Sequence, residues 1–311
     1  MNRFSRFVAA AVLLLVSAPS HAIAADQGGV LFRKGSALIS QATSPAYQTE
    51  GAKLIEEAAR MGHRAAQLKL ASLYANGTGV EKNLEESYRW FLTAAERGSV
   101  AGAYYVGLQL ELGRGVTQDY RAAAVWFQRA SDRGYADASF HLGLLYEKGL
   151  GMPQDFARAA FYYRRAGKRG DASATYNLAL LMEAGRGVDK NPAGAAELYI
   201  KAAQAGMPEA QTALCELLLE GKVVQKDPAR AVGWCRAAAV QDYPPAQMRL
   251  ASLLGQGLGV AKDGVRAYAW LLLAAARQYP PALKLQRGLR PRLSPQVVEK
   301  ARVLSLTLLA R

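Results

Sequence analysis

The sequence repeats itself every 36 residues, and this period limits the possible fold more than any other feature. Three series of residues keep the same step. The first, mostly glycine, consists of Gly62, Gly98, Gly134, Gly170, Gly206, Asp242 and Gln278. The second closes a glycine-rich loop at Val80, Val116, Met152, Val188, Val224 and Val260, and the third consists of Asn83, Asp119, Asp155, Asn191, Asp227 and Asp263. Six copies without insertions predict a tandem-repeat protein in which each copy packs on its neighbours.

Each copy is predicted to form two helices joined by a loop. Before the loop, Leu142, Leu145 and Tyr146 recur at helical spacing. After the loop, Asp155 can accept hydrogen bonds from the free N–H groups that begin a second helix. In this copy the second helix is expected to bury Ala159, Tyr162, Tyr163 and Ala166.

Small and aromatic residues alternate between the two helices in the same register. The small series on the first helix is Ala71, Gly107, Gly143, Ala179, Cys215 and Ala251. The aromatic series on the second helix is Phe91, Phe127, Tyr163 and Tyr199. Small side chains let helix axes approach closely, and a single hairpin cannot bury these faces alone, so neighbouring copies must complete the core.

These residues carry a resemblance to a known family. The pattern A-x-x-x-L-G-L-L-Y-E-x-G-x-G-V-x-x-D-x-x-x-A-x-x-W-F-x-x-A, followed closely at residues 101–130 and 136–166, resembles the Sel-like repeat family, a relative of the tetratricopeptide repeats. The resemblance implies an all-α fold, a right-handed α/α superhelix (solenoid) of about six 36-residue helix-turn-helix repeats. The chain departs from the pattern at GKVV in the fifth loop and at Asp242.

The sequence predicts four segments: a signal peptide at 1–24, a degenerate repeat or cap at 25–61, six repeats at 62–277 and capping helices at 278–311. Arg3 and Arg6 precede a short apolar run, which is typical of a secretory signal peptide and too short to span a bilayer. Cleavage is expected after Ala24, with Ala22 as the second choice, and an uncleaved anchor is the alternative. The mature chain is expected to be periplasmic or secreted, without a transmembrane segment.

Both ends of the repeat array are expected to be closed by caps. Gly35, Gly51, Ile55 and Ala58 keep the repeat register at the N-terminal end. At the C-terminal end, Ser294 and Pro295 are expected to begin a last helix that runs to about residue 309. Its apolar stripe consists of Val297, Val298, Ala301, Leu304 and Leu308.

The sequence contains no recognisable catalytic or metal-binding constellation. The glycine loops follow helices and repeat six times, which favours turns over phosphate binding. His63 and His141 have no partner at ligand spacing, and GxSxG, HExxH and SxxK motifs are missing. We therefore expect neither an enzyme nor a cofactor.

By resemblance, the first helices of successive pairs line a concave groove in which a protein partner binds. The expected contact residues are an aromatic column and a glutamate column: Tyr104, Phe140, Tyr176, Glu111, Glu147 and Glu183. The alternative is that these side chains only pack against or solvate their neighbours. Family resemblance suggests a scaffold or adaptor in envelope, exopolysaccharide, secretion or virulence processes.

Positive charge is concentrated in the last third of the chain. Residues 222–311 contain 15 basic and 4 acidic residues, whereas residues 25–221 contain 22 and 21. The candidate binding residues at this basic end are Arg249, Lys284, Arg287 and Arg290, with Arg266, Arg277 and Arg292 close by in the sequence. The alternative function is therefore a binding module for an anionic polymer (polysaccharide, lipid or cell-wall material), with nucleic acid not expected in an exported protein. A solvated surface without a partner is the competing interpretation.

The two cysteines occupy a small-residue position and an aromatic position of one predicted hairpin. Cys215 replaces glycine or alanine, and Cys235 replaces phenylalanine or tyrosine. The first position therefore holds a larger side chain than in most other copies, and the second position a smaller one. We expect the two side chains to touch and, in an oxidising compartment, to form a disulfide. Two buried thiols are the alternative.

Overall fold

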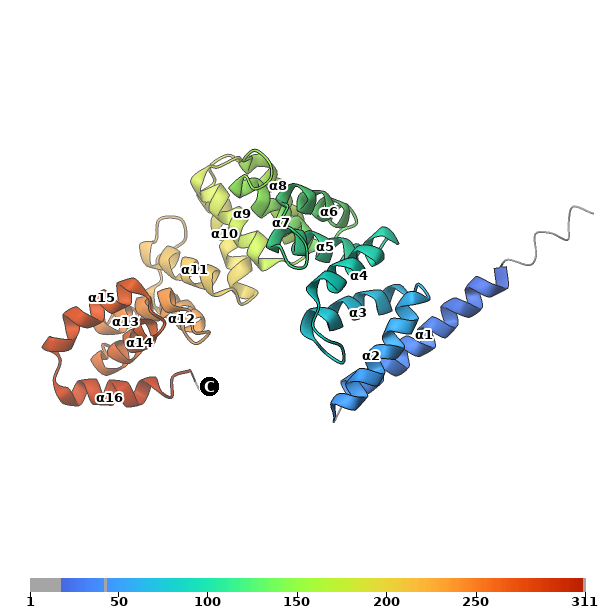
Figure 1. Cartoon of the computed structure of the whole chain (residues 1–311). Helices are drawn as coiled ribbons and strands as arrows, with labels where there is room; N and C mark the ends of the chain where they lie inside the picture. Colours follow the sequence, from blue (N-terminus) through green and yellow to red (C-terminus); the bar gives the residue numbers. More distant parts are fainter. Residues whose placement is uncertain (1–17, 42–43, 310–311) are drawn as a thin grey trace, which may run out of the picture. The chain divides into compact units, whose positions relative to one another are not determined.

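The computed structural model describes residues 18–41 and 44–309, with side chains described from residue 27 onward. Every regular element in this part of the chain is a helix, as expected (Figure 1). The charged start and the apolar run of the predicted signal peptide lie outside the described residues. No helix among those described is long and apolar enough to cross a membrane.

The chain divides into two compact units, and each has its own core. Unit 1 comprises Met1–Ala138 with Leu150–Pro153, and unit 2 comprises Ser139–Gly149 with Gln154–Arg311. The helices of unit 1 are α1 (Ala18–Ser40), α2 (Pro45–Arg60), α3 (Arg64–Asn76), α4 (Leu84–Glu96), α5 (Val100–Leu112) and α6 (Tyr120–Asp132). α7 (Ala136–Lys148) belongs to unit 2 for most of its length.

The remaining helices of unit 2 continue the pairs and close the array. The repeat helices are α8 (Phe156–Gly167), α9 (Ala172–Ala184), α10 (Pro192–Gln204), α11 (Pro208–Glu220), α12 (Pro228–Ala239), α13 (Pro244–Gln256) and α14 (Gly264–Ala276). The last elements are α15 (Pro280–Leu289), the 3₁₀ helix η1 (Arg290–Arg292) and α16 (Pro295–Ser305). Successive helices pack on one another from α1 to α6 and from α8 to α15, and α16 packs on α14.

The Asn/Asp series begins the second helix of every pair, as predicted. In each copy the side-chain oxygen accepts a hydrogen bond from the backbone N–H three residues ahead, at 2.8–3.0 Å. This bond satisfies one of the free donors in the first helical turn and so fixes where the helix starts. The capping residues are Asn83, Asp119, Asp155, Asn191, Asp227 and Asp263.

The glycine-rich loops are packing elements between neighbouring copies. The first glycine of the loop takes a positive φ at the end of the first helix, for example 73° at Gly77. The second lies against the start of the preceding second helix, where a Cβ on Gly115 would collide with the backbone of Leu84. The loop sequence therefore has a structural cause in every copy that contains it, and no phosphate site is needed to explain it.

Small residues of the first helix face aromatic residues of the second, as the register predicts. A Cβ on Gly107 would lie 2.7 Å from the ring of Phe127, and one on Gly143 would collide with Tyr163. Both rings are fully buried. The space between the two closely packed helices is thus filled by one large ring rather than by two medium-sized side chains.

Helices at both ends cover the repeat cores. Gly35 of α1 and Gly51 of α2 cross so closely that a Cβ on Gly35 would lie 2.6 Å from the Gly51 carbonyl oxygen. At the other end α16 packs on α14 (Figure 1). Ala301 of α16 is fully buried there. α16 ends at Ser305, earlier than the expected end near residue 309, and residues 306–309 continue as turns whose leucines 308 and 309 still contact the core.

Candidate functional site

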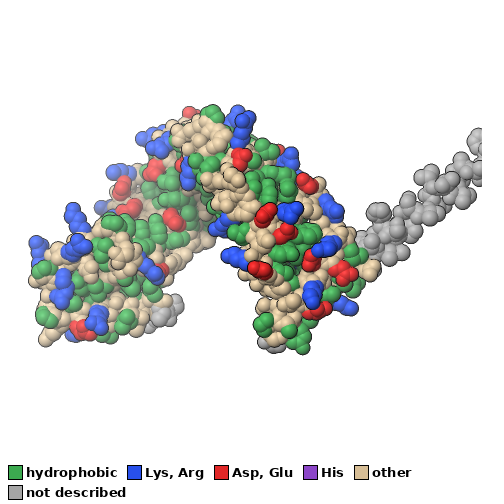
Figure 2. Space-filling model, in the orientation of Figure 1, with side chains coloured by type: hydrophobic (Ala, Val, Ile, Leu, Met, Phe, Trp, Pro, Cys, Tyr) green, Lys and Arg blue, Asp and Glu red, His purple; other side chains and the backbone are tan. Residues whose placement is uncertain are grey.

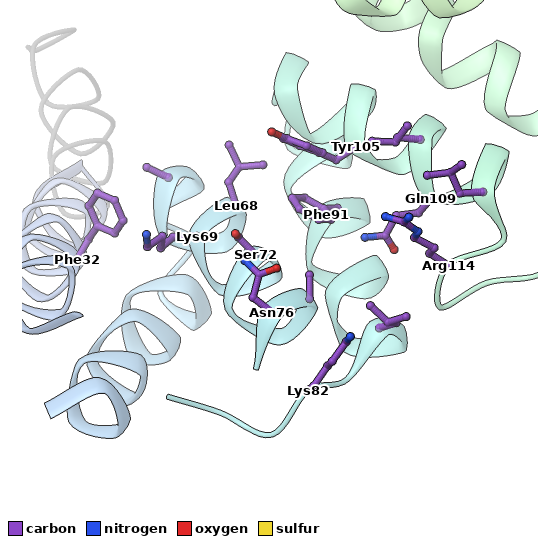
Figure 3. A pocket seen from close by; sticks show the side chains of 15 residues that line it. Phe32, Leu68, Lys69, Ser72, Asn76, Lys82, Phe91, Tyr105, Gln109 and Arg114 are labelled. Atoms are coloured by element: carbon purple, nitrogen blue, oxygen red, sulfur yellow. The ribbon is translucent and has the colours of Figure 1, made fainter. Parts of the chain in front are cut away.

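Unit 1 contains a groove of about 860 Å³ between the first helices of two successive pairs. α3 and α5 form its walls, α4 contributes to its floor, and Phe32 of α1 reaches its edge (Figure 3). The floor contains Phe91, whose ring stacks on Tyr105 with 4.7 Å between the ring centroids. Tyr105 and Leu112 remain exposed on the α5 wall. The volume is that of a typical ligand-binding cleft, roughly 300–1,000 Å³.

The charged residues of the groove are all basic. Lys69 lies on α3, Lys82 precedes α4, and Arg114 follows α5 (Figure 3). None of the residues that line the groove is acidic. The groove therefore combines an apolar floor with a positive rim, a combination that favours an anionic ligand with apolar groups.

One polar side chain on the α5 wall of this groove was not among the residues predicted from the sequence. Gln109 of α5 is buried, with 8% of its surface exposed, and it donates a hydrogen bond to Ser87 of α4 over 3.0 Å. A signal was present in the sequence, because every other copy has leucine at this position: Leu73, Leu145, Leu181, Leu217 and Leu253.

The predicted aromatic column lies between the helices of each pair. The ring centroids of Tyr104 and Phe127 are 6.0 Å apart, and those of Tyr176 and Tyr199 are 5.6 Å apart. Phe140 contacts Tyr163 in the same way, at 6.0 Å. All three predicted residues are half-buried. The groove of unit 1 is lined by Tyr105, the neighbour of the predicted Tyr104.

Two members of the predicted glutamate column accept hydrogen bonds from buried tyrosines. The hydroxyl of Tyr163 donates to Glu147, and the hydroxyl of Tyr199 donates to Glu183 over 2.8 Å. Burial, followed by this hydrogen bond, raises the pKa of both tyrosines well above the usual value of 10.0. These glutamates thus join the two helices of a pair, and a contact of theirs with a partner stays a prediction.

The third member of the column, Glu111, has a different environment. The residue at the tyrosine position of its pair is Phe127, which has no hydroxyl to donate. Glu111 is half-buried and takes part in other interactions of the chain. The column is therefore not chemically uniform, although its sequence is.

Cys215 of α11 and Cys235 of α12 meet in the core of unit 2. Their Cα atoms are 5.6 Å apart, the sulfurs are joined in a disulfide, and both residues are fully buried. The predicted contact within one hairpin is therefore present. Oxidation of the pair in the cell stays a prediction, tested below.

The basic end is partly neutralised by tertiary contacts. Arg249 of α13 forms an ion pair with Glu216 of α11, and Arg277 forms one with Asp242. Arg266 lies 3.4 Å from Asp263. The unpaired positive charge at this end is therefore smaller than the count of basic residues predicts. Arg249 in particular is paired with Glu216, which lies 33 residues away in the sequence.

The positive charge that remains lies on α15 and η1. Lys284 and Arg287 are exposed on α15, and Arg290 and Arg292 are exposed on η1. Figure 2 shows Lys and Arg side chains spread over this end of unit 2, with few acidic side chains among them. Within the described part of the chain, none of these four residues forms an ion pair.

No group of three or more His, Cys, Asp or Glu residues suited to a metal ion occurs among the residues that the structure describes. His63, one of the two histidines considered from the sequence, accepts a hydrogen bond at Nδ1 from the backbone of Ala66 and begins α3. Its role in the structure is therefore that of a helix cap.

Comparison with known families gives one match, and it covers the repeats. The Sel1 repeat model matches six consecutive segments, residues 64–99, 100–135, 136–171, 172–207, 208–243 and 244–279. No match was found among curated proteins.

Two solved structures are similar in both sequence and fold. A Sel1 repeat protein from Oxalobacter formigenes is 29% identical, with a TM-score of 0.70 over 80% of this chain and 97% of that chain. The protein c5321, described as a protective antigen present in uropathogenic Escherichia coli strains and displaying an SLR fold, is 27% identical, with a TM-score of 0.58 over 93% of this chain and 68% of that chain. The expected helical solenoid of Sel-like repeats is confirmed.

Proposed function

This chain belongs to the Sel1 repeat family, and from that premise we propose that it is a non-catalytic scaffold that is exported and binds a protein partner along the first helices of its repeats. Proteins of this family generally mediate protein–protein interactions, and their fold is typically a non-catalytic scaffold. The observation that carries the proposal is the groove between α3 and α5, which is apolar at its floor and open along one side.

The proposed location is the periplasm or the exterior, after cleavage following Ala24. The basic start and short apolar run of residues 1–16 support export, and a buried disulfide fits an oxidising compartment. The similar Escherichia coli protein is described as a protective antigen. We propose a role in envelope, exopolysaccharide or virulence processes, and N-terminal sequencing of the protein from a periplasmic fraction tests the location.

The experiment for the scaffold is a pulldown from envelope extract with matched surface variants. Leu112→Glu puts a charge on the α5 wall of the groove, where the leucine is 45% exposed. Val125→Glu makes the same kind of change on α6 outside the groove lining, where the valine is 50% exposed. A partner lost with Leu112→Glu and retained with Val125→Glu supports the proposal. Equal capture by both variants places the partner on another surface.

The predicted columns extend this proposal into unit 2. Tyr176 and Glu183 are the positions at which a partner would contact the α9–α10 pair, where the hydroxyl of Tyr199 already holds the glutamate in place. A glutamate with a fixed position loses less conformational entropy when it binds a partner's cation. Glu183→Gln is expected to weaken binding of a partner that uses this surface without unfolding the pair.

The second candidate function is binding of an anionic polymer at the C-terminal end. It is supported by the exposed cations Lys284, Arg287 and Arg290, which have no acidic partner among the described residues. Reversing all three to glutamate should abolish capture of an acidic polysaccharide or of anionic vesicles and remove the salt dependence. If the triple variant binds as well as the parent chain does, this function is refuted.

A further inference from the structure

Gln109 is the least expected side chain in the core of unit 1. Its register position is leucine in the other five copies, and four of those leucines are buried to 3% exposure or less. Its hydrogen-bond partner, Ser87, replaces the alanine found at 123, 159, 195, 231 and 267. Two polar groups therefore occupy positions where the fold elsewhere uses an apolar pair, so packing of the repeat does not require them.

This polar pair satisfies only half of the glutamine amide. Nε2 of Gln109 donates to Oγ of Ser87, but Oε1 is buried and has no hydrogen-bond partner. A buried polar atom without a partner costs free energy, so native proteins keep few of them. Gln109 is also one of the residues that line the groove, and Figure 3 shows its side chain beside Arg114 at the α5 wall.

The groove around Gln109 specifies the chemistry of what would satisfy it. A carbonyl oxygen accepts hydrogen bonds, so the ligand must offer an N–H or O–H group at the α5 wall. Lys69, Lys82 and Arg114 favour anionic groups on the same ligand. The stacked rings of Phe91 on the floor and Tyr105 on the α5 wall favour apolar side chains.

We propose that the groove between α3 and α5 binds an extended peptide segment rich in acidic and apolar residues, and that Gln109 accepts a hydrogen bond from its backbone. A peptide meets all three requirements at once, because it carries a backbone N–H at every residue apart from proline and places acidic and apolar side chains on alternate sides. The proposal rests on the proposed scaffold function and assigns the partner's chemistry and the contact residue.

Two sets of variants separate this role from a structural one. Ser87→Ala with Gln109→Leu recreates the Ala159–Leu181 pair that packs in the core of unit 2. It should therefore fold at least as stably as the parent chain while losing the acceptor. Lys82→Glu reverses one rim charge, and Lys262→Glu is its matched control, because Lys262 occupies the same register position in the last copy.

The test is selection of a displayed library of random 12-residue peptides on the full chain, followed by fluorescence anisotropy with labelled peptides. We expect the enriched peptides to contain acidic and apolar residues. Their affinity should fall at least tenfold in the Ser87→Ala/Gln109→Leu variant, although its urea midpoint is equal to or above that of the parent. Lys82→Glu should also weaken binding and flatten its salt dependence, and Lys262→Glu should leave both unchanged.

Two outcomes would overturn the inference. One is the absence of acidic and apolar peptides from the selected pool. The other is equal affinity for the parent and the Ser87→Ala/Gln109→Leu variant, which would mean that Gln109 has no role in binding. If an envelope protein is still captured in either case, the scaffold function stands and its partner binds at another surface.

Discussion

Reducing the bond between Cys215 and Cys235 is expected to lower the free energy of unfolding by about 3 kcal/mol. The bond joins α11 to α12 across a sequence separation of 20 residues. For a loop of this length, the loss of chain entropy in the unfolded state corresponds to roughly 3 kcal/mol at 25 °C. Both residues are fully buried, and reduced thiols stay compatible with an apolar core, so packing changes add little to this figure.

The next copy of the repeat supplies a matched control. Its residues at the same two positions are Ala251 and Leu271, both buried in the same core. The variant Cys215→Ala/Cys235→Leu therefore keeps native-like packing of the pair and removes the cross-link. Its stability should lie near that of the reduced parent chain and should not respond to reductant.

The assay is urea unfolding followed by circular dichroism, with and without reductant, together with alkylation of the unfolded protein to count free thiols. A difference of less than about 0.5 kcal/mol between the free energies of unfolding of the oxidised and reduced parent chains would refute this prediction. A cross-link that closes a loop of this length should lower the entropy of the unfolded chain by more than that amount. Two alkylated cysteines in protein isolated from the periplasm would refute oxidation in the cell.

Four further predictions concern the packing of the helix pairs and its dependence on pH. Gly143→Ala should destabilise the chain by about 1–2 kcal/mol, because the new Cβ collides with the buried ring of Tyr163. Gly233→Ala, which has no atom within 4 Å, should instead stabilise α12 by up to about 1 kcal/mol, and shifts of the same sign in the urea midpoints would contradict this reasoning. Tyr163→Phe should cost about 1 kcal/mol through loss of the hydrogen bond to Glu147, with the ring itself accommodated as Phe127 is in the preceding copy, and no change in the midpoint would contradict this. The pKa of Tyr163 is raised in the folded state, so the protonated tyrosine stabilises the fold fully below pH 10, and this stabilisation is lost as the pH rises beyond that value. The urea midpoint of the parent chain should therefore fall above about pH 10. The fall should be less steep in the Tyr163→Phe variant.

Local features of this fold were predictable because the repeat makes them local. The Asn/Asp series determines where the second helices begin, since the capping hydrogen bond spans only three residues. Small residues facing aromatic ones follow from the register alone, as Gly143 and Tyr163 show. Cys215 and Cys235 were predicted to touch by the same argument, because they occupy the same two positions.

The candidate site was less predictable because it depends on which side chains of adjacent helices meet. In unit 1 the groove is lined by Tyr105 of α5, the neighbour of Tyr104 in the predicted aromatic column, and contact of that column with a partner stays a prediction. A shift of one residue turns a side chain by about 100° around a helix axis. Periodicity locates a helix face well, but only packing decides which residue on that face remains accessible.

Sequence alone determined that this chain is a solenoid of helix pairs, where the second helix of each pair begins and which residues fill the space within a pair, because these depend on hydrogen bonds and contacts inside one 36-residue copy. Only the tertiary structure decided what the polar side chains do. It paired Arg249 with Glu216, used Glu147 and Glu183 to hold buried tyrosines, and left one oxygen of Gln109 without a partner beside an open groove. Charges and hydrogen bonds act over a few ångströms between separate helices, so composition can count them but only the packed helices can place them.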